Sequence, residues 1–205
     1  MTKEEIKKFV ASFTDKLDRT MVIVDYGNVE KWKYSLDWKV GLKELGQLVK
    51  NFSKEKVFLR RFYYGSDYGK NDNSQVLVGW SRSVIERARM NAFEIITKRV
   101  KYIHDSNNKT GFEKKCDLDV EMAIDLVKER DNYDTIILFS GDGDLMYAVK
   151  YLHDEYEKIC YVFGARDHVG REVFDAKKDG VVKDILFTED FEYRLKDSYV
   201  KQCRH

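Results

Sequence analysis

Short runs of apolar residues recur along this chain, separated by longer segments in which apolar residues return every three or four positions. The runs show little polar alternation, which is typical of strands buried on both faces of a parallel sheet. We therefore predict strands over residues 20–25, 56–64, 93–97, 135–140 and 158–164, with a further short strand over 182–187.

The longer segments have the spacing of amphipathic helices, and in the first of them Ile6, Phe9 and Phe13 fall on one helical face. Asp37 is the expected N-cap of the second helix, and Trp80 lies on the apolar stripe of the third, which places it in the predicted core. Polar composition predicts a loop over 65–73 and a long loop or irregular hairpin over 98–115. The helices are predicted over residues 3–17, 38–51, 75–91, 117–130 and about 142–155.

Strands that are separated by helical crossovers predict an α/β fold. We expect a central, mostly parallel sheet of five or six strands with helices on both faces, and a functional crevice beyond the carboxyl ends of the strands. The chain contains no proline, which favours one continuous domain. Its predicted parts are a helical extension over 1–19, a core over 20–190, and a C-terminal helix and tail over 191–205.

Composition adds limits rather than a function. The 37 lysines and arginines nearly balance the 36 acids, so the net charge of +1 gives no indication of a nucleic-acid partner. Three cysteines make a disulfide framework improbable and suit a reducing cytoplasm, which is the predicted compartment. No apolar run is long enough to cross a bilayer and the N-terminal residues lack an apolar signal core, so no membrane partner is predicted.

Aspartates follow two of the predicted strands and begin one of the predicted helices. Asp25 ends the first strand, the fourth strand runs into Ser140-Gly141-Asp142-Gly143-Asp144, and Asp117 and Asp119 lie where the 117–130 helix starts. Each acid alone has a structural explanation, because aspartates cap helices and favour helix N-termini. We assign this capping role to Asp117. Asp125 lies six residues beyond Asp119, on a different helical face, and is interpreted as a surface acid or a backbone hydrogen-bond partner.

Taken together, these acids indicate a metal site. The first and fourth strands are expected to be neighbours, and several carboxylates that share one crevice repel each other unless a cation offsets their charge. Oxygen-only ligation favours Mg²⁺ or Mn²⁺ over Zn²⁺. Such a site suits phosphodiester hydrolysis, in which the cation activates water and stabilises charge on the phosphate, and a spare carboxylate can act as general base.

Three motifs carry a family resemblance: VDYGN at 24–28, KCDLDVEMAIDL at 115–126 and LFSGDGDL at 138–145. Over about residues 20–190 the chain resembles the NYN family, the LabA-like branch of the PIN-like nuclease superfamily. The resemblance implies a three-layer PIN-like fold and Mg²⁺- or Mn²⁺-dependent cleavage of RNA. Cys116 stands where glycine is commoner in the family, which removes no carboxylate.

The resemblance also assigns roles to individual residues. It implies a catalytic, metal-binding set in which Asp119 is preferred to Asp117 because of its register in the motif. Asn28 would orient a ligand or water, and Ser140 would hydrogen-bond within the turn after the fourth strand. The metal-binding set is Asp25, Asp119, Asp142 and Asp144.

Basic residues near these acids are the candidates for contacting RNA phosphates. Tyr102 and Phe112 lie among them and could stack on unpaired bases. The competing explanation is a solvated loop whose charges only aid solubility. Trp32 is either a core residue or part of the cleft lining. The candidate RNA-positioning residues, besides Ser140, are Lys98, Arg99, Lys101, Lys114, Lys115, Arg166 and Arg171.

The leading functional hypothesis is therefore a metal-dependent ribonuclease, an endonuclease, with RNA as its partner. The alternative is a catalytically silent PIN-like module that binds RNA or a protein, and a homo-oligomer is left open. A phosphate-accepting receiver domain is disfavoured because its acceptor aspartate would follow the third strand, where the chain has Thr97-Lys98-Arg99. The turn after Asp25 lacks the Gly-x-Gly-x-x-Gly pattern of dinucleotide-binding domains.

Overall fold

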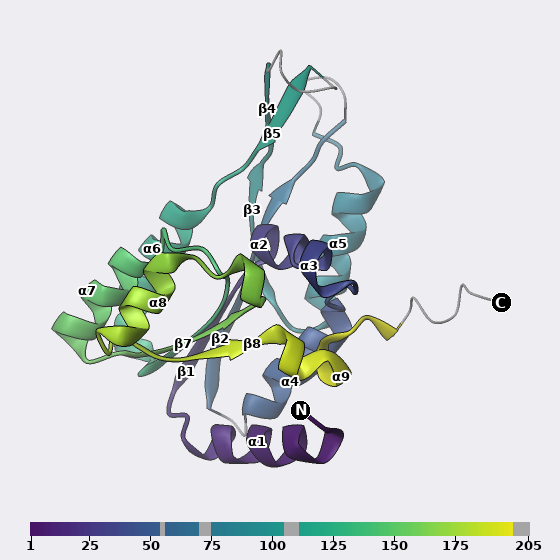
Figure 1. The fold of residues 1–205 in the computed structure, drawn as a ribbon. Coiled ribbons are helices and arrows are strands. Elements are labelled where there is room, and N and C mark those ends of the chain that lie inside the picture. The colour runs from purple at the N-terminus through teal and green to yellow at the C-terminus, as the bar shows by residue number, and fades with distance from the viewer. Residues whose placement is uncertain (54–55, 70–74, 105–110, 199–205) are drawn as a thin grey trace.

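A six-stranded sheet, in which every neighbouring pair is parallel, forms the centre of the protein (Figure 1). The computed structural model describes residues 1–53, 56–69, 75–104 and 111–198. The strand order is β3-β2-β1-β6-β7-β8, so β1 and β6 are neighbours at the middle of the sheet. The strands are β1 (Thr20–Asp25), β2 (Val57–Ser66), β3 (Glu94–Arg99), β6 (Thr135–Phe139), β7 (Ile159–Gly164) and β8 (Val182–Phe187). The predicted α/β fold is confirmed, with six strands.

Helices cover both faces of this sheet (Figure 1). On one face lie α1 (Lys3–Asp15), α2 (Tyr26–Lys31), α3 (Lys33–Leu36), α4 (Leu42–Ser53), α5 (Gly79–Met90) and α9 (Glu192–Leu195). On the other lie α6 (Asp119–Lys128), α7 (Met146–Tyr156) and α8 (Arg171–Lys178). Short 3₁₀ turns occupy Arg130–Asn132, Arg166–His168 and Thr188–Phe191. No helix in the described ranges has the length and apolar content that a membrane span requires.

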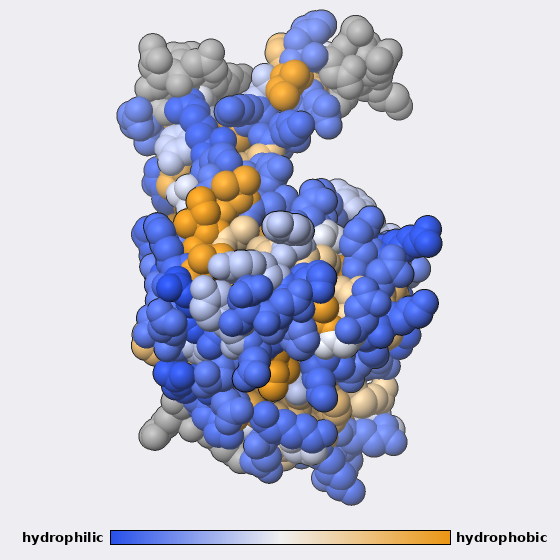
Figure 2. Space-filling view, turned by 90° about the vertical axis from the view of Figure 1, so that its left-hand side faces the viewer, coloured by the Kyte–Doolittle hydropathy of each residue, from blue (hydrophilic) through white to orange (hydrophobic). Residues whose placement is uncertain are grey.

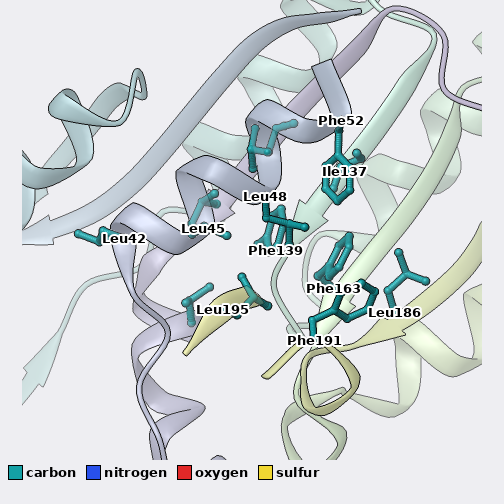
Figure 3. Packing of buried hydrophobic residues seen from close by; sticks show 14 of the residues in the cluster. Leu42, Leu45, Leu48, Phe52, Ile137, Phe139, Phe163, Leu186, Phe191 and Leu195 are labelled. Atoms are coloured by element: carbon teal, nitrogen blue, oxygen red, sulfur yellow. The ribbon is translucent and has the colours of Figure 1, made fainter. Parts of the chain in front are cut away.

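Alternate residues of each strand pack into the two layers, which explains why the strands read as continuous apolar runs. In β1, Val22 and Val24 join the cluster beneath α4, whereas Met21 and Ile23 join the cluster beneath α6 and α7. Figure 3 shows the first cluster, in which Leu45 and Leu48 of α4 face aromatic rings from the sheet. The rings of Phe139 and Phe163, from neighbouring strands, are stacked with their centroids 4.5 Å apart.

A small antiparallel hairpin leaves the carboxyl end of β3 and projects from the body at the top of Figure 1. It consists of β4 (Lys101–His104) and β5 (Phe112–Lys115), and β5 leads into α6. Of the two forms predicted for 98–115, a long loop or a hairpin, the structure therefore has the hairpin. Residues 105–110 at its tip lie outside the described ranges, as do residues 70–74 of the loop predicted over 65–73.

Three sequence predictions about helices are wrong in detail. Asp37 does not cap α4, because it ends α3 in a left-handed conformation with φ of 56° and α4 begins only at Leu42. The helix predicted from Asp142 begins at Met146. Trp80 is 61% exposed rather than in the core. The buried face of α5 carries Ser81, Ile85 and Ala88, and Trp80 lies about 100° away from that face.

The N-terminal helix packs onto the sheet layer. Ile6, Val10 and Phe13 are buried, and α1 lies against α4. The division into an extension, a core and a C-terminal part stays a prediction, and residues 199–205 of the predicted tail, with Cys203, lie outside the described ranges.

Candidate metal centre

Asp25 lies where β1 ends and α2 begins, beside the neighbouring strand β6. One of its carboxylate oxygens accepts a hydrogen bond from the backbone N–H of Asn28 at 3.2 Å, and the other accepts one from Ser140 Oγ at 3.1 Å. Burial raises the pKa of Asp25 above its usual value, and the charge of Asp142 adds to this effect, while the two hydrogen bonds oppose it. Asp25 is therefore a partly buried acid that is held by both central strands.

Asn28 links α2 to the turn after β6. Its side-chain oxygen accepts hydrogen bonds from Trp32 Nε1 at 2.8 Å and from the backbone N–H of Gly141 at 3.0 Å. Trp32 is fully buried, so it is a core residue and does not line the cleft. Because the amide oxygen is used within the fold, the Nδ2 group is the part of Asn28 that could reach a ligand or water.

The turn after β6 is fixed by side-chain to backbone hydrogen bonds. Buried Ser140 accepts a hydrogen bond from the backbone N–H of Asp142 at 3.2 Å, and Asp142 Oδ1 accepts one from the N–H of Asp144 at 3.2 Å. A Cβ atom at Gly141 would lie 1.8 Å from the carbonyl oxygen of His168, so only glycine fits there. These local bonds compete with helix formation and explain why α7 begins after Asp144.

Asp119 is the first residue of α6 and lies one position after the N-cap residue, Leu118. The predicted N-cap position of Asp117 is wrong by one residue, since Leu118 is the N-cap, but Asp117 still accepts a hydrogen bond from the backbone N–H of Asp119 at 2.9 Å. Lys98 Nζ donates to the carbonyl oxygen of Asp117 and pairs with Glu121, each at 2.8 Å. Lys98 thus braces the start of α6.

Three acids gather at this edge of the sheet. Ligand oxygens of Asp119, Asp142 and Asp144 all lie within 4.8 Å of one another. Asp25 is not a member of this close group, and its side chain accepts a hydrogen bond from Ser140. Burial raises the pKa of Asp119 to about 8, together with a hydrogen bond to Asp117 and the negative charges of Asp117, Asp142 and Asp25. Among the described residues, no lysine or arginine forms an ion pair with any of the four predicted metal ligands.

Crowded carboxylates without a basic partner are a donor set that suits a divalent cation. The oxygens come from α6 and from the turn after β6, and nitrogen or sulfur ligands are absent from this group. All-oxygen sites favour Mg²⁺, Mn²⁺ or Ca²⁺. The group is also partly open to solvent, since Asp144 is exposed.

The candidate RNA-contacting cations of the hairpin fall into two kinds. Lys101 and Lys115 are exposed, and the structure gives neither an ion pair within the described ranges. Lys114, by contrast, pairs with Asp67 at 2.5 Å, and the Arg99 guanidinium lies over the Tyr68 ring, 4.8 Å from its centroid.

The cations that follow β7 are exposed. Arg166 pairs with Asp190 at 3.1 Å and lies over the Phe187 ring. Arg171 pairs with Asp175, one helical turn away. Neither pair prevents contact with a phosphate, because exposed ion pairs are weak.

Asp125 has a role that the sequence did not indicate. It is neither a surface acid nor a partner of the backbone, because it accepts a hydrogen bond from Tyr63 Oη at 2.7 Å and pairs with Arg61 at 3.5 Å. Arg61 is buried and also pairs with Glu94 and Glu129. This network fastens α6 to the sheet and does not contribute a ligand to the acid cluster. The sequence did offer one signal for this network: Arg61 lies in the middle of a predicted strand, and a buried charge there needs acidic partners.

Comparison with known proteins gives consistent results. A family model described as "NYN domain" matches residues 19–183. The protein "Low amplitude and bright protein LabA" from Synechococcus elongatus is 36% identical over 70 residues, which is 34% of this chain and 38% of that protein. A crystal structure of a protein of unknown function from Vibrio parahaemolyticus has the same fold, with a TM-score of 0.62 and 20% identity over 84% of this chain and 94% of that chain.

Proposed function

This chain belongs to the NYN domain family, and from that premise we propose that it is a Mg²⁺- or Mn²⁺-dependent ribonuclease that cuts within RNA strands. Family membership suggests a nuclease, and NYN domains generally bind RNA. The observation that carries the proposal is the group formed by Asp119, Asp142 and Asp144, whose oxygens lie within 4.8 Å of one another. The proposed setting is a soluble, cytoplasmic protein.

In this proposal the three acids would hold the cation, which when bound would offset the negative charge that develops on the phosphate and would lower the pKa of the attacking water. A carboxylate of the cluster accepts the proton that the water releases. Asp25 acts through Ser140 rather than as a member of the close group. It holds the Ser140 hydroxyl, whose oxygen binds the backbone N–H of Asp142, and it adds negative charge to the site.

Asn28 serves the same site as a positioning residue. Its side-chain oxygen accepts a hydrogen bond from the backbone N–H of Gly141 and so fixes the backbone there. Its Nδ2 group is proposed to orient water or a ligand. Both Asn28 and Ser140 therefore set the geometry of the turn that carries Asp142 and Asp144. The exposed lysines of the hairpin and Arg166 and Arg171 are proposed to contact phosphates on either side of the scissile bond.

The test is cleavage of a mixed RNA pool by the purified full chain, with the cut ends mapped. Cleavage is expected with Mg²⁺ or Mn²⁺, should stop on addition of EDTA and should return when excess cation is restored. Internal cuts are expected, rather than stepwise shortening from one end. RNA that is bound but never cut under any of these conditions would contradict the proposal and favour a silent binding module.

A further inference from the structure

Asp67 is a buried carboxylate that lies just past the carboxyl end of β2, outside the acid cluster. It is 1% exposed and accepts hydrogen bonds from Trp80 Nε1 at 3.1 Å, Tyr102 Oη at 2.7 Å and Lys114 Nζ at 2.5 Å. Its backbone N–H donates to Ser81 Oγ at 2.9 Å. A single side chain thereby fastens both strands of the hairpin to α5.

The two aromatic rings bound to Asp67 are exposed. Trp80 is 61% exposed and Tyr102 is 57% exposed, although the polar atom of each ring is fixed by the buried carboxylate. Aromatic residues that serve the core bury their rings, as Trp32 does while its Nε1 donates to Asn28. At Trp80 and Tyr102 the polar atom is likewise bonded but the ring is exposed, so the fold holds two apolar ring surfaces in fixed positions in solvent.

The hairpin extends this aromatic surface. Tyr102 is paired with Lys114 and His104 with Phe112, so these four side chains share one face of the hairpin. The rings of His104 and Phe112 contact each other with centroids 5.9 Å apart, and Phe112 is largely exposed. Figure 2 shows the projecting part at the top of the molecule, where apolar and hydrophilic side chains are mixed.

The charge of the hairpin favours an anionic ligand. Between residues 98 and 116 the described positions include one acid, Glu113, and five cations, of which Lys98 pairs with Glu121 and Lys114 with Asp67; the other three are Arg99, Lys101 and Lys115. Lys101 lies directly opposite Lys115 in the antiparallel pair. Like charges in that position repel each other and destabilise a hairpin, and a bound polyanion would remove this repulsion.

We propose that Trp80 and Tyr102 form a stacking platform for the bases of single-stranded RNA, held in place by Asp67. The proposal rests on the proposed function for the identity of the ligand. A single strand is favoured because its unpaired bases offer free faces to aromatic rings, whereas duplex bases are already stacked on one another. β5 leads through Cys116 to Asp119, the first residue of α6, so a short segment of chain connects the platform to the acid cluster.

Binding of fluorescein-labelled oligouridine tests the platform, with Asp142→Asn present in every protein so that the RNA stays intact. Trp80→Ala and Tyr102→Ala should each weaken binding by roughly 5- to 100-fold, the loss of about one stacked base. Trp80→Phe keeps a ring and loses the hydrogen bond to Asp67, so it should lose less affinity than Trp80→Ala. Phe58→Ala is the matched control, since Phe58 is 55% exposed at the amino end of β2, and it should bind as the parent does.

Two further ligands make the result specific for bases. A matched strand with abasic sugars should bind the parent more weakly than oligouridine binds Trp80→Ala, because it loses stacking on both rings. A duplex should bind the parent and Trp80→Ala equally. Thermal melting of each variant checks that its fold is intact.

The proposal is overturned if Trp80→Ala and Tyr102→Ala, both folded, bind oligouridine as tightly as the parent. It is also overturned if Trp80→Phe loses as much affinity as Trp80→Ala, because the indole would then act only through Asp67. Failure of the proposed function gives a different result: base-dependent binding with no metal-dependent cleavage by the wild-type chain. A wild-type chain that binds no RNA would contradict both proposals.

Discussion

At the scale of single residues, the ionised form of Asp119 is strongly disfavoured in the folded protein. Burial and the neighbouring acids raise its pKa to about 8, far above the ordinary value for an aspartate. A folded-state pKa above the unfolded value means that the folded protein binds the proton more tightly. The contribution of Asp119 to the free energy of unfolding is therefore most favourable at low pH and declines as pH rises from about 4 to about 8.

Without divalent cations, the free energy of unfolding from urea titrations in EDTA should therefore fall between about pH 5 and pH 8. Asp119→Asn should flatten this slope, because the amide does not titrate. Excess Mn²⁺ should also flatten it for the wild-type chain, since cation binding favours the ionised carboxylate. Equal slopes for the wild type and Asp119→Asn in EDTA would show that ionisation of Asp119 does not cause the loss of stability with pH.

At the element scale, the strands were the most predictable parts of the protein. A strand that is buried on both faces requires only a sufficiently long run of apolar residues, as in β1 and β6, and the residues around it have little effect on this pattern. Helix ends were less predictable. The start of α7 depends on hydrogen bonds among Ser140, Asp142 and Asp144, and the exposure of Trp80 depends on which face of α5 meets the sheet. Neither can be read from periodicity alone.

Helix α1 offers a test at this scale, because it precedes the segment that matches the family. The Phe13 ring meets Phe52 of α4 and Tyr161 of β7 edge to face, with centroids 5.2 and 4.8 Å apart. Phe13→Ala should reduce the free energy of unfolding by about 3–5 kcal/mol, as for other large-to-small core changes. Urea denaturation measures the loss. Phe58→Ala, at an exposed ring, should change it by less than about 0.5 kcal/mol. Similar small losses for both would mean that α1 is only loosely attached.

At the scale of the whole molecule, the site is assembled where β1 and β6 end side by side. The sequence motifs named Asp25, Asp119, Asp142 and Asp144, and the topology brings all four to one edge of the sheet. What the motifs could not predict is the arrangement among them. Asp25 is outside the close group of the other three and is hydrogen-bonded to Ser140, and the side-chain oxygen of Asn28 accepts hydrogen bonds from Trp32 and Gly141. The burial of Asp67 could not be predicted from the sequence, since its hydrogen-bond partners come from three distant segments.

The most direct test of the central claim is the single-turnover rate of RNA cleavage at saturating Mn²⁺ for the wild type, Asp142→Asn and Asp154→Asn. Asp154 is the matched control, an exposed aspartate near the other end of α7 that pairs with Lys150. Asp142→Asn should cleave at least about a hundredfold more slowly while remaining folded, because loss of a cation ligand removes several kcal/mol of transition-state stabilisation. Asp154→Asn should match the wild type. A folded Asp142→Asn protein that cleaves RNA at the wild-type rate would contradict the account.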